Sequence, residues 1–471
     1  MKKALCIVFI LAGFASLQAQ NSFTGIWQGN FISDSRDLLM VLRISDSDGK
    51  LKASLDMPQL LLVDFKSVKI TTENDSVWLD VPAFKAKYSA ARIDDSLRGI
   101  WLQQGEETPI VLGLTPEDKA FRMFRPQTPQ PPFPYISKEV TFRNSKAKIN
   151  LAGTLTIPDT TGKWPVVVLV SGSGAQDRNE ELLKHQPFLV IADYLTRNGI
   201  AVLRYDDRGV GQSEGTFATA TTFDFNNDAG AAVTYLTKLD FIDAKAIGII
   251  GHSEGGIIAM MQASQNKKLR FAISLAGVTI PCSQLLVMQQ DKMFEGSGKS
   301  EDMRELWWNF STQYYDLLQS SSTAEELRAQ TLELLKTTTA DLSEEQCKEY
   351  GFSEANINTL LMQSGSAWFK TFVTIIPSKY VSKIRCNFLA LNGSSDVQVP
   401  AEANIEGFNS YIVRKQGLIL DSHIFPGLNH LFQSCKTGMP GEYAMIETTI
   451  DPVVLQYMVD WIKKVLVTNK E

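Results

Sequence analysis

A serine, a histidine and an aspartate, the residue types that together carry out acyl transfer, occur in this chain in settings that suit the chemistry. Residues 251–255 read Gly-His-Ser-Glu-Gly, after one apolar run and before a second that contains small residues. A Gly-x-Ser-x-Gly pattern between a strand and a helix is typical of a sharp turn that presents the serine as a nucleophile. The flanking glycines lack the Cβ atoms that would collide there. The pattern therefore predicts Ser253 as the nucleophile.

Four histidines are candidates for the general base that such a serine needs. His430 follows the apolar run 418–425 on a predicted loop, where a base can face the serine. His423 lies within that run and is the alternative. His252 adjoins the serine, with its ring expected to point away from the active face, and His185 begins a helix before the turn. The pattern favours His430 as the base.

The acid is expected between the serine and the histidine in chain order, and Asp396 satisfies that order. It comes just after the apolar run 387–391, at the sheet edge where the serine is also expected. Glu402 and Asp421 are the alternatives, but the first begins a helix and the second interrupts a strand. In this arrangement His430 would take the serine proton, while Asp396 would fix the imidazole tautomer and stabilise the imidazolium.

Two backbone N–H groups are expected to stabilise the oxyanion that forms when the serine attacks an acyl carbon. One is that of Glu254, directly after the predicted nucleophile and at a helix N-terminus. The other is expected from the loop 171–174 after the third core strand, with Ser173 as the first choice and Gly174 as the second. The carboxylate of Glu254 is expected to serve the helix start rather than the reaction.

Glycine-containing segments elsewhere in the chain do not fit nucleotide sites. Residues 172–177 follow a strand but lack the third glycine of a dinucleotide fingerprint, and Met293 stands where a phosphate-binding loop ending at 298–300 needs glycine. The charges of residues 204–211 suit loop-fixing ion pairs better than phosphate binding. None of the cysteines has metal-ligand spacing. We therefore expect neither a cofactor nor a metal.

The elements that must position these residues predict an α/β architecture. Beyond residue 135, continuous apolar runs alternate with amphipathic helical stretches, which is typical of a mainly parallel sheet covered on both faces. A helical block rich in aromatic residues, from about 278 to 383, interrupts this alternation; most of its aromatic residues are expected to pack, with one or two lining a pocket. The expected strands are 138–142, 151–157, 165–170, 200–205, 246–250, 271–275, 387–391 and 418–425, and the expected helices are 187–198, 224–238, 402–413 and 453–467.

Residues 21–122 have a different, β-rich pattern of short runs between turn residues. Gly-Ile-Trp-Gln-Gly at 25–29 has an echo, Gly-Ile-Trp-Leu-Gln, at 99–103. These segments are either the first and last strands, paired in a small barrel or sandwich, or two unrelated aromatic strands. Five prolines between residues 126 and 134 then predict an extended linker over 123–135. The expected organisation is thus a β-rich unit with a structural, targeting or surface-binding role, a linker, and a capped α/β domain over 136–471.

Residues 1–20 predict a secretory signal peptide, because Lys2 and Lys3 precede an apolar run over 4–17 and a small or polar end. We expect an exported protein, periplasmic or extracellular, and no later run is long enough to span a membrane. The full chain has 46 basic and 52 acidic residues, a net charge of −6, which argues against nucleic acid as the main partner. Four cysteines beyond the signal peptide are too widely spaced to form a disulfide framework. The sequence does not indicate an oligomeric state.

Five motifs together resemble those of bacterial α/β-hydrolases, and they lie at residues 171–174, 206–211, 251–256, 392–400 and 427–430. The chain is most similar to exported EstD-like carboxylesterases, which pair a β-rich N-terminal domain with a capped hydrolase domain. Ser171 departs from the pattern, since many α/β-hydrolases carry histidine there. The resemblance implies an α/β-hydrolase fold with a helical cap and hydrolysis of carboxylic esters with small or medium acyl groups. A serine peptidase of aminopeptidase type, on the same triad, is the alternative, and a non-catalytic envelope or glycan-binding protein is the lesser one.

Overall fold

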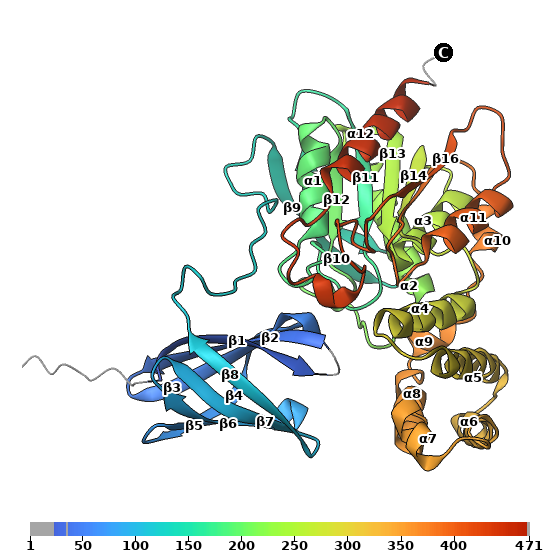
Figure 1. Cartoon of the computed structure of the whole chain (residues 1–471). Helices are drawn as coiled ribbons and strands as arrows, with labels where there is room; N and C mark the ends of the chain where they lie inside the picture. Colours follow the sequence, from blue (N-terminus) through green and yellow to red (C-terminus); the bar gives the residue numbers. More distant parts are fainter. Residues whose placement is uncertain (1–22, 34–35, 469–471) are drawn as a thin grey trace, which may run out of the picture. The chain divides into compact units, whose positions relative to one another are not determined.

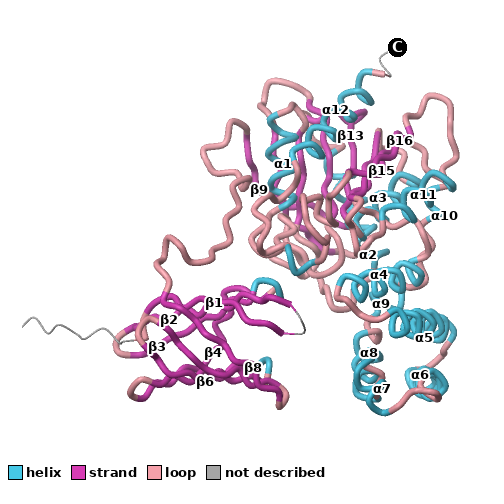
Figure 2. Tube along the Cα trace, viewed as in Figure 1, coloured by secondary structure: helices cyan, strands magenta, loops and turns pink. Residues whose placement is uncertain are grey.

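The computed structural model describes residues 23–33 and 36–468, so the predicted signal peptide lies outside the described residues. The chain divides into two compact units between Arg122 and Met123 (Figure 1). The first unit is built mainly from β-strands, whereas the second combines a sheet, the helices that cover it and a helical insertion (Figure 2).

The first unit is a closed barrel of eight antiparallel strands in sequence order. The barrel closes where β1 pairs with β8, with Trp27 opposite Leu114. Alternating apolar residues fill the interior, and the Tyr88 ring, fully buried, lies at its centre. The strands are β1 (Gly25–Ser33), β2 (Arg36–Ser47), β3 (Lys50–Met57), β4 (Leu62–Glu73), β5 (Ser76–Val81), β6 (Ala86–Ile93), β7 (Ser96–Gln103) and β8 (Glu106–Leu114).

The two similar aromatic segments lie in β1 and β7, and these strands do not pair with each other. β7 lies between β6 and β8, so pairing of the two segments was the wrong one of the two interpretations. Trp27 and Trp101 nevertheless both belong to the barrel core. A strand's apolar pattern determines which face turns inward, but it does not determine the neighbouring strand.

The second unit is organised around an eight-stranded sheet with the order β16-β15-β14-β13-β11-β12-β10-β9. β10 runs antiparallel to both β9 and β12, and the remaining neighbours are parallel. The central strands are buried along their length, which explains their continuous apolar runs. The strands are β9 (Ile136–Asn144), β10 (Ile149–Ile157), β11 (Trp164–Val170), β12 (Ala201–Tyr205), β13 (Ile242–His252), β14 (Phe271–Leu275), β15 (Asn387–Gly393) and β16 (Leu420–Phe425).

Helices cover both faces of this sheet (Figure 1). One face carries α1 (Pro187–Arg197) and α12 (Pro452–Val467), and the other carries α2 (Thr222–Leu236), α3 (Glu254–Gln265) and α11 (Ala401–Tyr411). The predicted fold class, an α/β-hydrolase architecture after a small all-β unit, is confirmed. The helix expected from residue 224 begins at 222, because Thr221 and Asp224 form a reciprocal capping box there.

The insertion between β14 and β15 consists of helices and loops and forms the cap (Figure 2). Its aromatic residues mostly pack against one another, as expected: the Trp307 and Phe352 rings stack with centroids 4.4 Å apart, and the Tyr314 side chain is fully buried. The helices are α4 (Cys282–Gly296), α5 (Glu301–Ser320), α6 (Ala324–Thr338), α7 (Glu344–Tyr350), α8 (Glu354–Gln363), α9 (Ala367–Phe372) and α10 (Ser378–Val381).

The proline-rich segment 123–135, expected to be an extended linker, belongs to the second unit and forms hydrogen bonds with it. The Gln127 side chain donates to the carbonyl oxygen of Ile450 at 2.7 Å and accepts from the Thr449 N–H at 2.6 Å. Besides the carbonyl oxygen of its neighbour Phe124, the Arg125 guanidinium donates to those of Leu183, Ala444 and Ile446. A proline-rich composition predicts an extended segment. It does not predict whether the other side chains of that segment form hydrogen bonds with the rest of the fold.

The four cysteines among the described residues are all unpaired, and they are Cys282, Cys347, Cys386 and Cys435. Burial raises the pKa of the Cys282 thiol well above its usual value and that of Cys386 to about 12. Both thiols are therefore protonated and behave as small apolar side chains in the core.

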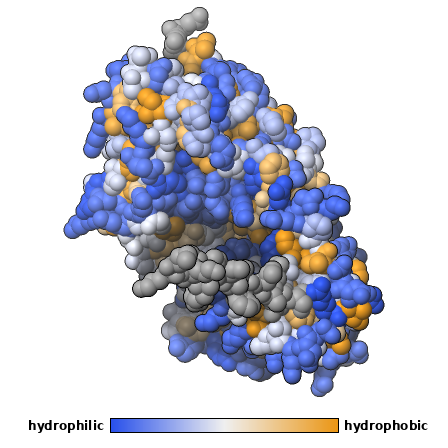
Figure 3. All heavy atoms as spheres, turned by 90° about the vertical axis from the view of Figure 1, so that its left-hand side faces the viewer, coloured by the Kyte–Doolittle hydropathy of each residue, from blue (hydrophilic) through white to orange (hydrophobic). Residues whose placement is uncertain are grey.

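The face of the molecule drawn in Figure 3 is mostly hydrophilic, and its apolar residues form small separate groups. Such scattered apolar residues are normal on protein surfaces. Among residues 23–33 and 36–468, no helix is long and apolar enough to cross a membrane.

Candidate active site

Ser253 occupies a sharp turn between β13, which ends at His252, and α3, which begins at Glu254. Its backbone has φ 55° and ψ −116°, a conformation that costs a non-glycine residue about 1–3 kcal/mol. A Cβ atom on Gly251 would lie 1.8 Å from the carbonyl oxygen of Gly255, so no larger residue fits there. The sequence pattern thus corresponds to a strained turn that holds the half-buried serine at the end of a central strand.

His430 follows β16 and Asp396 follows β15, and their side chains lie within hydrogen-bond distance of each other. The distance between His430 Nδ1 and Asp396 Oδ2 is 2.8 Å, and each residue is 5% exposed. The other carboxylate oxygen, Oδ1, accepts from the backbone N–H groups of Gln398 and Val399, both at 2.8 Å. Both carboxylate oxygens of Asp396 therefore accept hydrogen bonds. The one that faces His430 selects the imidazole tautomer that carries its proton on Nδ1. That tautomer leaves Nε2 as the basic nitrogen.

The alternative base and acids lie in other environments. The His423 ring stacks on the Tyr457 ring with centroids 5.0 Å apart. The Asp421 carboxylate accepts from the indole N–H of Trp461 at 3.0 Å, and Glu402 lies in the first turn of α11. The structure therefore brings His430 together with Asp396 and with none of these alternatives.

The loop after β11 passes directly beside the serine. A Cβ atom on Gly172 would lie 3.2 Å from the Ser253 Cβ. Ser173 and Gly174, the two expected oxyanion donors, follow Gly172 on this loop. The loop thus has the position that an oxyanion-binding segment needs.

The Glu254 carboxylate lies in the first turn of α3, as expected, and it also binds two other helices. It accepts from the Thr222 hydroxyl at 2.6 Å and from the Trp368 indole N–H at 2.9 Å. Thr222 begins α2, and Trp368 belongs to α9 of the cap. Burial raises the pKa of Glu254, while these hydrogen bonds act in the opposite direction. The side chain next to Ser253 therefore connects the cap to the turn, and Trp368 is an aromatic cap residue that reaches this turn.

The His252 ring is buried and lies between Glu180 and the backbone of His430. Its Nε2 lies 3.0 Å from the carbonyl oxygen of His430, and its Nδ1 lies 2.9 Å from Oε1 of Glu180. Nothing in the sequence around Glu180 identified it as a site residue. The Gly-x-Ser-x-Gly pattern predicts the position of Ser253 from nearby residues. The contacts of its neighbour His252, in contrast, depend on His430, 178 positions away.

The loop after β12 is fixed by ion pairs, as its charges predicted. Arg178 binds Asp206, and Arg208 binds Asp228. Asp207, between them, accepts from the Ser171 hydroxyl and from the Gln176 N–H, both at 3.0 Å. Burial, with smaller effects of the Glu254 and Glu180 carboxylates, raises the pKa of Asp207 to about 8. Ser171 thus anchors the loop after β11 to a buried carboxyl group.

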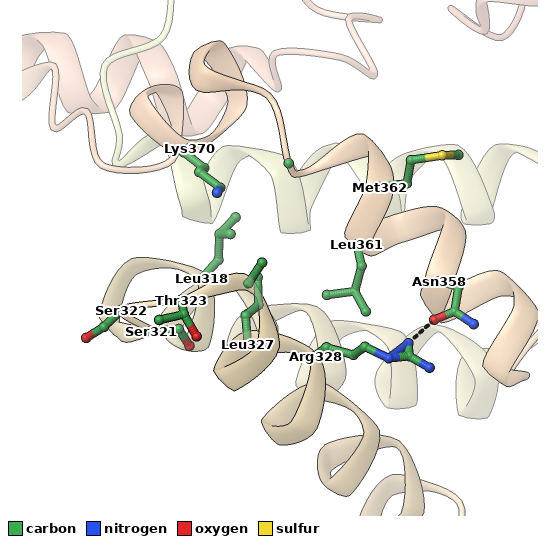
Figure 4. A pocket seen from close by; sticks show the side chains of 12 residues that line it. Leu318, Ser321, Ser322, Thr323, Leu327, Arg328, Asn358, Leu361, Met362 and Lys370 are labelled. Atoms are coloured by element: carbon green, nitrogen blue, oxygen red, sulfur yellow. Dashed lines mark hydrogen bonds between the residues drawn. The ribbon is translucent and has the colours of Figure 1, made fainter.

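A pocket of about 520 Å³ lies within the cap (Figure 4). Leu318, Leu327 and Leu361 surround its interior, and Arg328 hydrogen-bonds Asn358 at one side. The described residues that line it include no histidine, aspartate or glutamate, so it lacks the residue types of a serine hydrolase triad other than serine. The residues that suit hydrolysis are those at the sheet edge around Ser253.

Several known proteins are similar to this chain. The family model described as X-Pro dipeptidyl-peptidase (S15 family) matches residues 148–425, more than half of the chain. Esterase EstD of Thermotoga maritima is 32% identical over 134 residues, which are 28% of this chain and 32% of that protein. The 2,6-dihydropseudooxynicotine hydrolase of Paenarthrobacter nicotinovorans is 32% identical over 121 residues, which are 26% of this chain and 30% of that protein.

The matched segments thus span about a third of the length of these curated relatives. Among solved structures, the α/β hydrolase GrgF from Penicillium sp. sh18 is 17% identical with a TM-score of 0.44. That match covers 70% of this chain and 98% of the other.

Proposed function

Since the chain belongs to the X-Pro dipeptidyl-peptidase (S15) family of α/β-hydrolases, we propose that it cleaves carboxylic esters with Ser253, His430 and Asp396 as a catalytic triad. The observation that carries the proposal is the 2.8 Å contact between His430 Nδ1 and Asp396 Oδ2. It leaves a basic Nε2 on a loop that packs against the serine turn, since the His252 and His430 rings lie 4.8 Å apart.

In the proposed reaction, Nε2 of His430 takes the hydroxyl proton of Ser253 as Oγ attacks the ester carbonyl carbon. The resulting oxyanion is bound by the N–H of Glu254, at the N-terminus of α3, and by an N–H of the loop that contains Ser173 and Gly174. Collapse of the tetrahedral intermediate breaks the ester bond, and the imidazolium gives its proton to the departing alcohol. Water, deprotonated by the same imidazole, then attacks the acyl-enzyme and releases the acid and the free serine.

Ester hydrolysis is supported by the similarity to a protein named as an esterase, EstD. The second candidate, a serine peptidase, is supported by the family model, whose description names an X-Pro dipeptidyl-peptidase. Both reactions use the same triad and differ in the leaving group, an alcohol or an amine. The preference for an ester or a peptide substrate therefore depends on how the cap residues near Trp368 accommodate the leaving group.

A paired assay on the purified protein tests these candidates. p-Nitrophenyl acetate and butyrate report ester cleavage, and a dipeptidyl p-nitroanilide with proline in the second position reports peptidase activity. We expect turnover of the esters that Ser253→Ala abolishes. Turnover of the anilide alone would favour the peptidase, and the absence of serine-dependent turnover of either would favour a non-catalytic envelope or glycan-binding protein.

We also propose that the chain is exported and acts on a small-molecule ester outside the cytoplasm. The proposal depends on the N-terminal pattern of two lysines, an apolar run and a small or polar end. N-terminal sequencing of the protein expressed from its full reading frame should find cleavage near Ala19 or Gln20. An intact N-terminus in the cytoplasmic fraction would contradict export.

A further inference from the structure

A second histidine–carboxylate pair lies directly behind the proposed triad. Glu180 is 6% exposed and His252 is 8% exposed, so the pair is buried. His252 Nδ1 lies 2.9 Å from Glu180 Oε1, and His252 Nε2 lies 3.0 Å from the carbonyl oxygen of His430. The pair takes no part in the proton transfers of the proposed reaction.

The contacts of His252 determine where its protons lie. A carbonyl oxygen only accepts, so Nε2 must carry a proton to bond His430. Nδ1 faces a carboxylate oxygen, so a proton lies between these two atoms as well. Burial lowers the pKa of His252, but the Glu180 charge and hydrogen bond and the His430 carbonyl outweigh it, and the pKa lies above its usual value. Both ring nitrogens thus face hydrogen-bond acceptors, an arrangement that favours the doubly protonated ring beside Glu180.

Glu180 connects this ring to the oxyanion loop. The same oxygen, Oε1, accepts from the Gly172 N–H at 2.7 Å. Its other oxygen is buried and has no hydrogen-bond partner among the described residues, so both donors converge on one atom. The residue after Gly172 is Ser173, the first candidate for an oxyanion donor.

We propose that Glu180 and His252 act as a positioning pair, which holds the oxyanion loop and the His430 loop at a fixed distance from the Ser253 turn. The inference rests on the function proposed above, since it assigns the pair to that reaction. His252 is joined to Ser253 by one peptide bond, Glu180 anchors Gly172, and His252 anchors the His430 backbone. One pair thus links all three segments that must converge in the transition state.

The charged groups around the pair are consistent with a balanced unit. The charge of Asp396 also raises the pKa of His252, and the charge of Glu180 raises the pKa of the buried Asp207. Removing the imidazolium alone would leave the Glu180 charge buried among these carboxylates. Removing the carboxylate alone would leave a buried cation that loses one of its protons and with it one hydrogen bond. The two residues are therefore expected to depend on each other.

The test uses His252→Gln, Glu180→Gln and the double variant, with the ester that the purified wild type hydrolyses. Both glutamines preserve side-chain size and some hydrogen bonding. His185→Gln is the control, because His185 is also a buried histidine bonded on both nitrogens, to Thr449, Tyr443 and Gln433, and no hydrogen bond joins it to Glu180 or His430. Thermal unfolding and far-UV circular dichroism verify the fold of every variant.

We expect each single variant to lower kcat by about 10²-fold with little change in KM, since small displacements of a catalytic constellation have effects of that size. The double variant should be hardly worse than either single one, because the two residues act as a unit. His185→Gln should lower the unfolding temperature but leave kcat unchanged. Kinetic losses no larger than those of His185→Gln, or losses that multiply in the double variant, would overturn the inference.

A spectroscopic measurement does not depend on the folding of the variants. In wild-type protein labelled with ¹⁵N-histidine, one ring should carry slowly exchanging protons on both nitrogens near neutral pH. In Glu180→Gln that ring should carry only one. A wild-type spectrum in which every ring has an unprotonated nitrogen at neutral pH would contradict the pair. Full activity of Ser253→Ala would instead refute the proposed function, so the two failures are distinguishable.

Discussion

At the scale of single residues, the proposed reaction makes Ser253 and His430 one catalytic unit. The serine hydroxyl is not acidic enough to attack without the imidazole, and the imidazole has no other role in the attack. Ser253→Ala and His430→Ala should therefore each lower kcat by about 10⁴-fold or more, and the double variant should be hardly worse. Steady-state kinetics on the ester panel measure this. Near-normal turnover by Ser253→Ala would refute the assignment.

Asp207 gives a second prediction at this scale. Its folded-state pKa of about 8 lies well above that of an ordinary aspartate, so between about pH 4 and pH 8 the folded protein holds a proton that the unfolded chain does not. The free energy of unfolding should consequently fall as pH rises through this window. Asp207→Asn mimics the protonated carboxyl group and should remove this fall. Thermal unfolding of both proteins from pH 5 to pH 8 checks it; parallel curves would show that Asp207 is not protonated.

At the scale of elements, helix α9 links the cap to the nucleophile turn through the Trp368 indole and the Glu254 carboxylate. Trp368→Phe keeps the ring packing but removes the N–H. A buried carboxylate then loses a donor, which typically costs about 1–3 kcal/mol. We expect kcat/KM to fall by roughly tenfold or more, because the N–H of Glu254 is a proposed oxyanion donor.

Trp307→Phe is the control for this change. The Trp307 indole also donates a hydrogen bond within the cap, to the carbonyl oxygen of Tyr350 at 2.8 Å, but it does not contact Glu254. It should therefore lower the unfolding temperature without a selective effect on kcat/KM. Equal effects of the two substitutions would mean that the cap contact at Glu254 has no catalytic importance.

At the scale of the whole molecule, the division between Arg122 and Met123 places the proline-rich segment with the hydrolase unit. A chain that begins at Met123 should therefore fold and keep the proposed esterase activity. A chain that begins at Ile136 loses Arg125 and Gln127, which donate to four backbone carbonyl oxygens of that unit. Its unfolding temperature should be several degrees lower, at about 1 kcal/mol for each lost hydrogen bond. Equal unfolding temperatures of the chains that begin at Met123 and at Ile136 would show that these hydrogen bonds do not stabilise the unit.

Much of the fold was predictable because its signals are local. A continuous apolar run such as 165–170 indicates a strand covered on both faces, and the turn at Ser253 is encoded by glycines within two residues of it. Asp396 and His430 each follow such a strand. Since the carboxyl ends of parallel strands lie at one sheet edge, their chain order was enough to expect the pair that the structure brings to 2.8 Å.

The sequence by itself therefore determined the fold class, the turn at Ser253 and the candidate acid and base. The tertiary structure alone decided which strands close the barrel, that Glu254 binds Trp368 across 114 residues, and that His252 bonds Glu180 and His430. The physical reason is that periodicity reports whether a side chain is buried, whereas its partner depends on how distant segments pack. Buried polar groups must find such partners, and their choice is made only when the chain folds.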